Sequence, residues 1–460
     1  MSLGTLKLFR LILLTVFTQC LLANTLPDFE LIKKGEQDGN TLLIIGGIQG
    51  DEPGGFMSAS LIATHYTITK GSVWVVPNLN FDSIIKRSRG RFGDMNRKFS
   101  NLSKKDPDFA NVERIKNLIQ ENDVKMIINL HDGSGFYRKK YIDNMHSPRR
   151  WGQSVIIDQT KIKVEKYNNL LDISNRVTKS INKNLIKKEH YYEVRNTKTK
   201  DGDIEMEKSL TYFAINRGKS AFANEASKSL PVHQRTYYHL LALEEYMSVM
   251  GIEFTRNFKL ESRALKNVID NDISISFHDN KVQLPLSKIR NIVKYFPINK
   301  DGILKFKASN PLMTIVKKDN MYSIHYGNRR VARLIPDYLD IDDINNFVEV
   351  KIDGIKKEVK LGTLLNVNKN FYIFPKDEVR VNIIGYSRKN IKNESGISVS
   401  KNQIMKKFSL DKRGKIFRVE FYKEKKFTGM LLVHFNKRKQ KAIAFNNTNE
   451  RASLIIKLSK

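Results

Sequence analysis

The first half of the chain carries two alternating hydrophobic patterns. Continuous apolar runs predict buried strands, and apolar residues spaced three or four positions apart predict helices. Because such strands and helices alternate, residues 24–251 are expected to form an α/β domain with a mixed, largely parallel sheet flanked by helices. The predicted strands cover residues 42–48, 72–77, 124–130, 155–157 and 220–224, and the predicted helices cover 56–66, 107–122, 168–186 and 232–250, the second with Asp106 as its N-cap.

The pattern changes near Gly251. From there, short segments with alternating apolar and polar residues are separated by turn signals such as Asp353-Gly354, which predicts all-β structure. The acidic stretch 337–346 is the expected linker between two β domains. We therefore predict a barrel-like β domain over residues 252–343 and an immunoglobulin-like sandwich over residues 344–460.

Residues 1–23 have the layout of a secretory signal peptide. Two basic residues precede an uncharged apolar run of about 13 residues, and the chain turns polar after Ala23, the expected cleavage point. This run is shorter than the roughly 20 residues that a membrane-spanning helix needs. Gln19 is bulkier than the residue expected before a lipid-modified cysteine, which disfavours a lipoprotein. Cys20 is the only cysteine, so disulfides, thiolate nucleophiles and cysteine metal sites are excluded from the mature chain.

The chain is strongly basic. Its 80 Lys and Arg residues against 48 Asp and Glu residues give a formal net charge of +32, which indicates acidic partners. The basic residues are spread along the chain, and an exported protein seldom meets nucleic acid. Anionic cell-wall polymer is therefore the favoured partner, and part of the excess is the ordinary charge of a lysine-rich, solvated surface.

Three potential metal ligands follow two of the predicted strands. Gln49 and Glu52 lie three residues apart in a glycine-rich turn after the first strand, and His131 directly follows residues 124–130. Since sites in parallel sheets form beyond the carboxyl ends of strands, the three side chains can meet. An amide, a carboxylate and an imidazole with one open position approach the pattern of catalytic zinc. In the alternative reading, Gln49 and Glu52 cap the start of a helix.

A basic segment at residues 78–100 could bind a carboxylate. The terminal carboxylate of a peptide is best held by a bidentate cation with an amide donor beside it, and Asn96 and Arg97 provide this pair. Arg87 and Arg89 lie a few residues before them. The alternative is a solvated basic loop.

Glu225 follows the predicted strand at residues 220–224. A carboxylate at the end of a buried strand could act as a general base and later protonate a leaving amine. The alternative is a buried salt bridge to one of the arginines.

Taken in order, these stretches resemble the zinc metallo-carboxypeptidase (funnelin) family over about half of the chain. That family shows an H-x-x-E motif, an arginine, a D-L-N-R-x-F motif, a strand-terminal histidine and a late glutamate. The corresponding residues here are Gln49-Gly50-Asp51-Glu52, Arg87 or Arg89, Asp94 to Phe99, His131 and Glu225.

Glutamine replaces the first histidine of the motif. This substitution, the signal peptide and the two β domains resemble a narrower group, the D,L-carboxypeptidases that trim peptidoglycan tripeptides to dipeptides and set helical cell shape in some Gram-negative bacteria. The resemblance implies one zinc ion held by Gln49, Glu52 and His131, with Glu225 as the base. It also implies that Arg89, or less readily Arg87, acts on the scissile carbonyl or a carboxylate, and that Asn96, Arg97 and Thr211 contact substrate.

The function expected from this resemblance is that of a periplasmic zinc D,L-carboxypeptidase acting on peptidoglycan muropeptides. It would cleave the bond between γ-D-glutamate and meso-diaminopimelate, and its β domains would contact protein partners that act in cell shape. Two alternatives remain open: a catalytically degenerate module that binds cell-wall peptides, and a deacylase or amidase on the same scaffold. Nucleic-acid binding ranks behind both.

Overall fold

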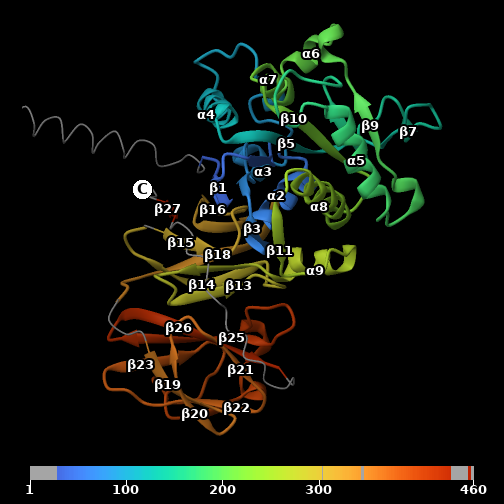
Figure 1. Ribbon diagram of the computed structural model, residues 1–460. Helices are drawn as coiled ribbons and strands as arrows, with labels where there is room; N and C mark the ends of the chain where they lie inside the picture. The colour runs from blue at the N-terminus through green and yellow to red at the C-terminus, as the bar shows by residue number, and fades with distance from the viewer. Residues whose placement is uncertain (1–27, 303, 343–346, 437–453, 457–460) are drawn as a thin grey trace, which may run out of the picture.

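The computed structural model describes residues 28–302, 304–342, 347–436 and 454–456. The predicted signal peptide and residues 343–346 of the predicted linker lie outside these ranges. Figure 1 shows three stacked parts: an α/β domain in blue to green, a middle β domain in yellow and a C-terminal β domain in orange to red. Within the described ranges, no helix combines the length and the apolar character required to cross a membrane.

The first domain is built on a seven-stranded mixed sheet. Four neighbouring strands run parallel, whereas β1 pairs antiparallel with β4, and β8 pairs antiparallel with β10. This confirms the predicted mixed, largely parallel sheet. In spatial order the strands are β1 (Ile32–Gly35), β4 (Ser72–Val76), β2 (Thr41–Ile45), β5 (Val124–Gly133), β10 (Ser220–Ser227), β8 (Ser154–Ile157) and β9 (Glu193–Asn196).

Helices cover both faces of this sheet, which explains why β2 and β4 are continuous apolar runs with every residue buried. Helices α2 (Pro53–His65), α8 (Val232–Val249) and α5 (Leu170–Asn182) pack together on one face. On the other face lie α4 (Phe109–Gln120) and α7 (Leu210–Asn216), and α3 (Phe81–Lys86) follows β4 (Figure 1). Three short elements complete the domain: β6 (Phe136–Tyr137), β7 (His146–Ser147) and α6 (Ile204–Glu207).

Several predicted boundaries differ from the structure. Helix α4 begins after Asp108 rather than Asp106, because the Asp106 carboxylate accepts hydrogen bonds from Lys98 Nζ and the Asp108 N–H group. Helix α5 is shorter than predicted and begins after its N-cap, Asn169. The sheet continues through His131 and Glu225, so these two residues lie within β5 and β10 rather than beyond them.

The chain beyond Gly251 still contributes to the first domain. Strand β11 (Glu253–Arg256) pairs with β3 (Tyr66–Lys70), which directly follows α2, and helix α9 (Ser262–Asn271) packs against α8. The change of pattern at Gly251 therefore precedes the point at which the chain leaves the first domain.

The middle domain consists of two four-stranded sheets, where a barrel-like arrangement was predicted. Strand β18 extends to Leu339 and so includes the start of the predicted acidic linker. Strand β27, near the end of the chain, pairs with β15 of this domain. The first sheet contains β13 (Val282–Pro285), β12 (Ser274–Phe277), β15 (Leu304–Ala308) and β27 (Leu454–Ile456), and the second contains β14 (Ile292–Asn299), β18 (Arg329–Leu339), β17 (Met321–Tyr326) and β16 (Met313–Lys318).

The C-terminal domain is a sandwich of two four-stranded sheets. Val350 and Phe371 from one sheet and Val419 and Leu431 from the other belong to a single buried cluster. The sheets contain β20 (Ile355–Lys360), β19 (Phe347–Ile352), β22 (Asn370–Ile373) and β24 (Ser398–Ser400), and β21 (Leu364–Val367), β26 (Lys426–Phe435), β25 (Ile416–Lys423) and β23 (Val379–Ile383).

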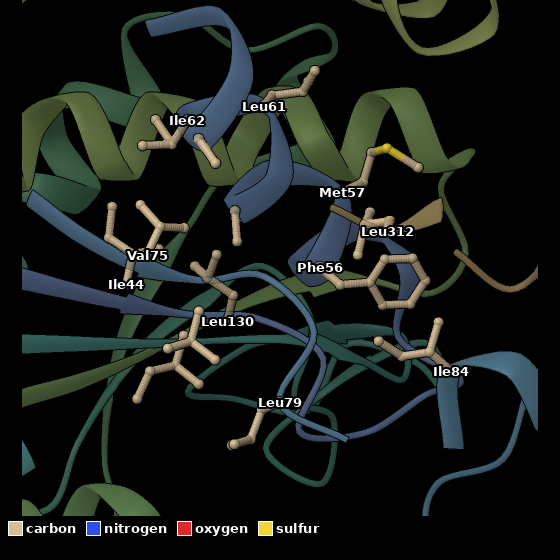
Figure 2. Close-up of a cluster of buried hydrophobic side chains, with 14 of the residues drawn as sticks. Ile44, Phe56, Met57, Leu61, Ile62, Val75, Leu79, Ile84, Leu130 and Leu312 are labelled. Carbon is tan, nitrogen blue, oxygen red and sulfur yellow. The ribbon is translucent and has the colours of Figure 1, made fainter. Parts of the chain in front are cut away.

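The first and middle domains share one hydrophobic core. Figure 2 shows Leu312, which precedes β16, packed beside Phe56 and Met57 of α2. The Tyr326 hydroxyl contacts Met57 Sδ at 3.0 Å, and Gly327, in the turn between β17 and β18, lies against the Phe56 ring. The middle domain therefore supports the helix that starts directly after Glu52.

Arg418 of β25 joins the middle and C-terminal domains. It is fully buried and donates to the backbone carbonyls of Tyr295 and Lys294 at 2.9 and 3.0 Å, while Glu420 pairs with it at 3.1 Å. Phe427 of β26 packs in the core of the first two domains. These contacts make the junction a buried interface rather than a simple tether.

Candidate active site

The turn after β2 directs Gln49 and Glu52 toward the same point. Gly50 allows the close approach that this turn requires, because a Cβ atom there would lie 2.0 Å from the Ser83 carbonyl, and the Gly50 N–H group donates to the Ser88 carbonyl at 2.9 Å. Glu52 occupies the N-cap position of α2, but its side chain makes no capping hydrogen bond. The alternative that the Glu52 side chain caps the helix is therefore not observed.

Three donor atoms from two strand ends converge at this turn. His131 Nδ1 lies 3.1 Å from Gln49 Oε1 and 3.0 Å from Glu52 Oε2, and all three residues are buried. Tetrahedral zinc with ligand distances of about 2.0–2.2 Å separates its ligand atoms by roughly 3.3–3.6 Å, so a small outward movement would admit an ion. Nowhere in the described ranges, this site included, do three His, Cys, Asp or Glu side chains form a metal-binding group. The amide of Gln49 is what completes this donor set.

Asp94 orients the Gln49 amide. Asp94 Oδ1 accepts from Gln49 Nε2 at 2.7 Å, and Oδ2 accepts from Arg89 Nε at 2.9 Å. Burial alone would raise the pKa of Asp94, but the Gln49 hydrogen bond and the Arg89 charge lower it overall. The ionised carboxylate thus turns the amide oxygen toward His131. The sequence reasoning assigned Asp94 no role, although it opens the Asp94–Phe99 motif.

Glu225 lies beside His131 on the neighbouring parallel strand, and the two residues are in register. Its side chain is buried, and Oε2 has no hydrogen-bond partner in the described part of the chain. Burial raises the pKa of Glu225 to about 8, although nearby His131 opposes the shift. No salt bridge to Glu225 forms among the described residues, so the salt-bridge alternative is not observed.

Two cations flank Glu52. Arg89 lies with Nη1 3.6 Å from Glu52 Oε1, and Lys228, just beyond β10, lies with Nζ 3.4 Å from the same oxygen. Lys228 also pairs with Asp51 at 2.7 Å. By contrast, Arg87 is turned toward the middle domain, where its Nε donates to the Asn328 carbonyl. Of the two candidate arginines, the structure therefore brings Arg89 to the site. Sequence reasoning missed Lys228, which lies three residues after Glu225.

Asn96 and Arg97 lie across the cavity in a short 3₁₀ turn. Asn96 Oδ1 accepts from the Leu210 N–H group at 3.1 Å, so its Nδ2 atom remains available as a donor. Arg97 Nε lies 3.8 Å from the exposed Glu205 carboxylate. Thr211, in the first turn of α7, faces the same space.

Most of these groups line one cavity of about 240 Å³, and Asp94 and Asp51 lie behind its wall as hydrogen-bond or ion-pair partners of lining residues. It contains every predicted site residue except Arg87. The predicted residues in its wall are Gln49, Glu52, Arg89, Asn96, Arg97, His131, Thr211 and Glu225, and the residues that sequence reasoning missed include Asn129, Trp151, Ile156, Met206, Ala223 and Lys228.

Asp132 anchors the strand that carries His131. Its carboxylate accepts from the Gly54 N–H group at 2.7 Å and pairs with Arg235 at 3.0 Å and His239 at 3.2 Å. Burial alone would raise the pKa of Asp132, but these partners lower it overall. The network ties the end of β5 to the start of α2, which keeps His131 opposite Glu52. His239 is thus a buried partner of Asp132 and not a member of the donor set.

Two family models match this chain. Residues 10–270 match the catalytic domain of a carboxypeptidase controlling helical cell shape, and residues 341–436 match the C-terminal domain of a metallo-carboxypeptidase. A comparison with curated protein sequences gives no match.

Solved structures of the cell shape determinant protein Csd4 from Helicobacter pylori are similar over most of the chain. The apo form is 40% identical, with a TM-score of 0.80 over 89% of this chain and 100% of that one. A tripeptide-bound form is 39% identical, with the same TM-score and coverage. An mDAP-bound form, described as a D,L-carboxypeptidase, is 39% identical with a TM-score of 0.80 over 88% of this chain and 100% of that one.

Proposed function

We infer the substrate and the bond from one premise: this chain belongs to the family of metallo-carboxypeptidases that control helical cell shape. We propose that it is a zinc D,L-carboxypeptidase of the periplasm. Its substrates are peptidoglycan tripeptides, and it hydrolyses the bond between γ-D-glutamate and meso-diaminopimelate to leave dipeptides. The tripeptide and mDAP bound to the similar Csd4 structures support this substrate class.

The observation that carries the proposal is the meeting of Gln49 Oε1, Glu52 Oε2 and His131 Nδ1 in a cavity that also contains Glu225, whose Oε2 has no hydrogen-bond partner in the described part of the chain. These are two oxygen donors and one nitrogen donor, and the set leaves a coordination position open, as catalytic zinc sites do. When bound, zinc would supply a Lewis acid that polarises the scissile carbonyl and activates the attacking water.

The remaining chemistry belongs to side chains of this protein. Glu225, as a carboxylate, takes a proton from the attacking water and returns it to the departing amine of diaminopimelate. Arg89 reaches the oxygen of the scissile carbonyl, where negative charge develops, and stabilises it. Asn96 and Arg97 bind the terminal carboxylate, so the scissile bond is placed one residue from the end of the peptide.

The charge of the cavity suits the substrate. The tripeptide has carboxylates on D-glutamate and on both centres of diaminopimelate, and the cavity wall presents the cations of Arg89, Arg97 and Lys228. Such a wall favours an acidic peptide over a neutral one, in keeping with the basic character of the whole chain.

The test is hydrolysis of a purified muropeptide tripeptide by the zinc-loaded protein, with products identified by mass. We expect diaminopimelate and the dipeptide, loss of both after chelation, and recovery when zinc is returned. Glu225→Gln serves as the control that keeps the donor set and removes the base. An intact tripeptide after incubation with zinc-loaded wild type would refute the proposed activity, and full turnover by Glu225→Gln would refute the assigned base.

The proposed periplasmic location has its own test. Cell fractionation of the full chain and of a form lacking residues 1–23 should place only the full chain in the periplasm. Equal export of both forms would contradict the signal-peptide assignment.

A further inference from the structure

Asn129 occupies a position in the cavity that the chemistry above does not use. It lies two residues before His131 on β5, so both side chains are on the same face of the sheet. Its neighbour in register on β10 is Ala223, which also lines the cavity. Asn129 is thus part of the cavity wall, and it is shielded from bulk solvent.

Among the described residues, neither polar atom of this amide has a partner. Asn129 Nδ2 and Oδ1 are both buried, and neither makes a hydrogen bond within the described part of the chain. Asn224, on the opposite face of β10, differs in one atom: its Nδ2 is 2.8 Å from His239 Nδ1, although its Oδ1 also has no partner among the described residues. A buried amide without partners is destabilising, and leucine would fill the same volume without that cost. An unpaired amide that faces a substrate cavity therefore points to a polar group of the substrate.

The surroundings of Asn129 limit which group this is. The cavity residues in register with Asn129 across the sheet are neutral, because Ala223 of β10 pairs with Asn129 and Ile156 of β8 pairs with Ala223. The nearest charged residue on β10 that lines the cavity, Glu225, lies two positions further along the strand. The amide offers one acceptor and one donor. An amino acid centre, with an ammonium and a carboxylate on one carbon, offers a donor for the Asn129 oxygen and an acceptor for its nitrogen. Such a centre has no net charge, so it needs no buried counter-ion.

We propose that Asn129 is a specificity-determining residue that binds the distal amino acid centre of the diaminopimelate side chain. This rests on the proposed function, which supplies diaminopimelate as the released residue. The Asn129 Oδ1 atom accepts from the distal ammonium, and Nδ2 donates to the distal carboxylate. A lysine side chain leaves the donor unpaired and brings an unbalanced charge, and an alanine side chain leaves both amide atoms unpaired.

The experiment compares three tripeptides that end in meso-diaminopimelate, L-lysine or L-alanine. In Asn129→Leu, we expect kcat/KM for the diaminopimelate peptide to fall about 10- to 100-fold, mainly through KM, and that for the alanine peptide to change less than about threefold. Binding of free diaminopimelate, measured by calorimetry, should weaken about 10- to 100-fold. The Tm should stay equal or rise, because an unsatisfied amide has been removed.

Two further variants separate recognition from structure. Asn129→Asp keeps the size of the side chain and replaces the donor by a negative charge, so the ratio of lysine to diaminopimelate turnover should rise at least about tenfold. Asn224→Leu, on the other face of the sheet, should lower the Tm and leave the ratios between peptides unchanged.

The outcomes distinguish this inference from the proposed function. If wild type releases no diaminopimelate, the proposed function fails. If wild type releases it and Asn129→Leu affects all three peptides equally, or none, then the role of Asn129 is wrong while the proposed function stands. A Tm lowered by Asn129→Leu with unchanged selectivity would likewise assign Asn129 to structure alone.

Discussion

In the proposed zinc site, the amide oxygen of Gln49 would alter the metal chemistry without changing the charge of the site. Glutamine and histidine ligands are both neutral, but zinc favours nitrogen over amide oxygen, so the ion should be held less tightly than by a two-histidine site. The hydrogen bond from Gln49 Nε2 to Asp94 would offset part of this weakness, because it fixes the amide with its oxygen on the side of Glu52 and His131.

Substitutions at Gln49 test the hypothesis that its amide oxygen is a zinc ligand. We expect Gln49→Ala to weaken zinc binding at least about 100-fold and to abolish turnover, because only two ligands remain. Gln49→His should keep zinc. Zinc content after dialysis and calorimetric titration measure both effects, with Arg87→Ala as the control because Arg87 does not line the cavity. Equal zinc affinity in wild type and Gln49→Ala would remove Gln49 from the donor set.

The raised pKa of Glu225 predicts a proton linked to metal binding. With a pKa of about 8 in the metal-free protein, Glu225 is mostly protonated near neutral pH, whereas a free glutamate is ionised. A cation bound beside it favours the carboxylate, so zinc binding at about pH 7 should release up to about one proton more in wild type than in Glu225→Gln. The difference should vanish above about pH 9, where the proton is already lost.

Calorimetry in buffers of different ionisation enthalpy counts these protons. His131 also gives up protons when the metal binds, and because the Glu225 carboxylate helps to raise the pKa of His131, the comparison reports the protons of this pair together. Equal proton release by wild type and Glu225→Gln near neutral pH would show that the buried carboxylate is already ionised.

The meeting of several site residues was predictable from residue type and order, whereas their roles came from the family resemblance. Strongly apolar runs predict buried strands of a parallel sheet, and sites form at the carboxyl ends of such strands. The residues that end or follow such runs are Gln49, Glu52, His131 and Glu225. Asn129 and Lys228 were not predictable, because a strand-internal asparagine and a surface-like lysine have no spacing that separates them from ordinary residues. The choice of Arg89 over Arg87 depends on the left-handed backbone of Arg87 at the end of α3, which local sequence does not specify.

At the scale of elements, the turn between β17 and β18 links two domains through Gly327. Its φ of 53° disfavours a side chain, and an added Cβ would lie 2.8 Å from Cε2 of the Phe56 ring. Gly302 has a similar φ of 69° but nothing within 4 Å. We expect Gly327→Ala to lower the free energy of unfolding by about 1–3 kcal/mol more than Gly302→Ala, as measured by denaturant unfolding. Equal losses would mean that the Phe56 contact carries no strain.

The predicted elements were most accurate where burial was complete. The central strands β2, β4 and β5 are buried along almost their whole length, so their apolar runs stand out. The edge strands β1 and β9 are half exposed and mixed in composition, and the sequence reasoning missed both. Strands β3 and β11 were missed for a related reason, because they form a separate two-stranded sheet and have little apolar pattern of their own.

At the scale of the whole molecule, Arg418 and Glu420 set how firmly the last domain is attached. Both side chains are buried at the junction. Arg418→Ala leaves Glu420 buried without its cation and should cost about 3–5 kcal/mol, whereas the double variant Arg418→Met/Glu420→Leu should recover most of that loss. Thermal unfolding and limited proteolysis report both effects. A double variant no more stable than Arg418→Ala would show that the carbonyl contacts of Arg418, rather than the ion pair, hold the junction.

The core shared by Phe56, Met57 and Leu312 makes the hydrolase a poor candidate for modular engineering. A fragment that stops near Gly251, where the α/β pattern ends, would expose apolar side chains at the start of α2 to solvent. This helix begins directly after Glu52, a predicted zinc ligand. Replacing the middle domain by that of another enzyme would likewise change the residues that pack against α2, behind the turn that carries Gln49 and Glu52. Truncations, domain exchanges and fusions should therefore keep the first two domains together as one folding unit.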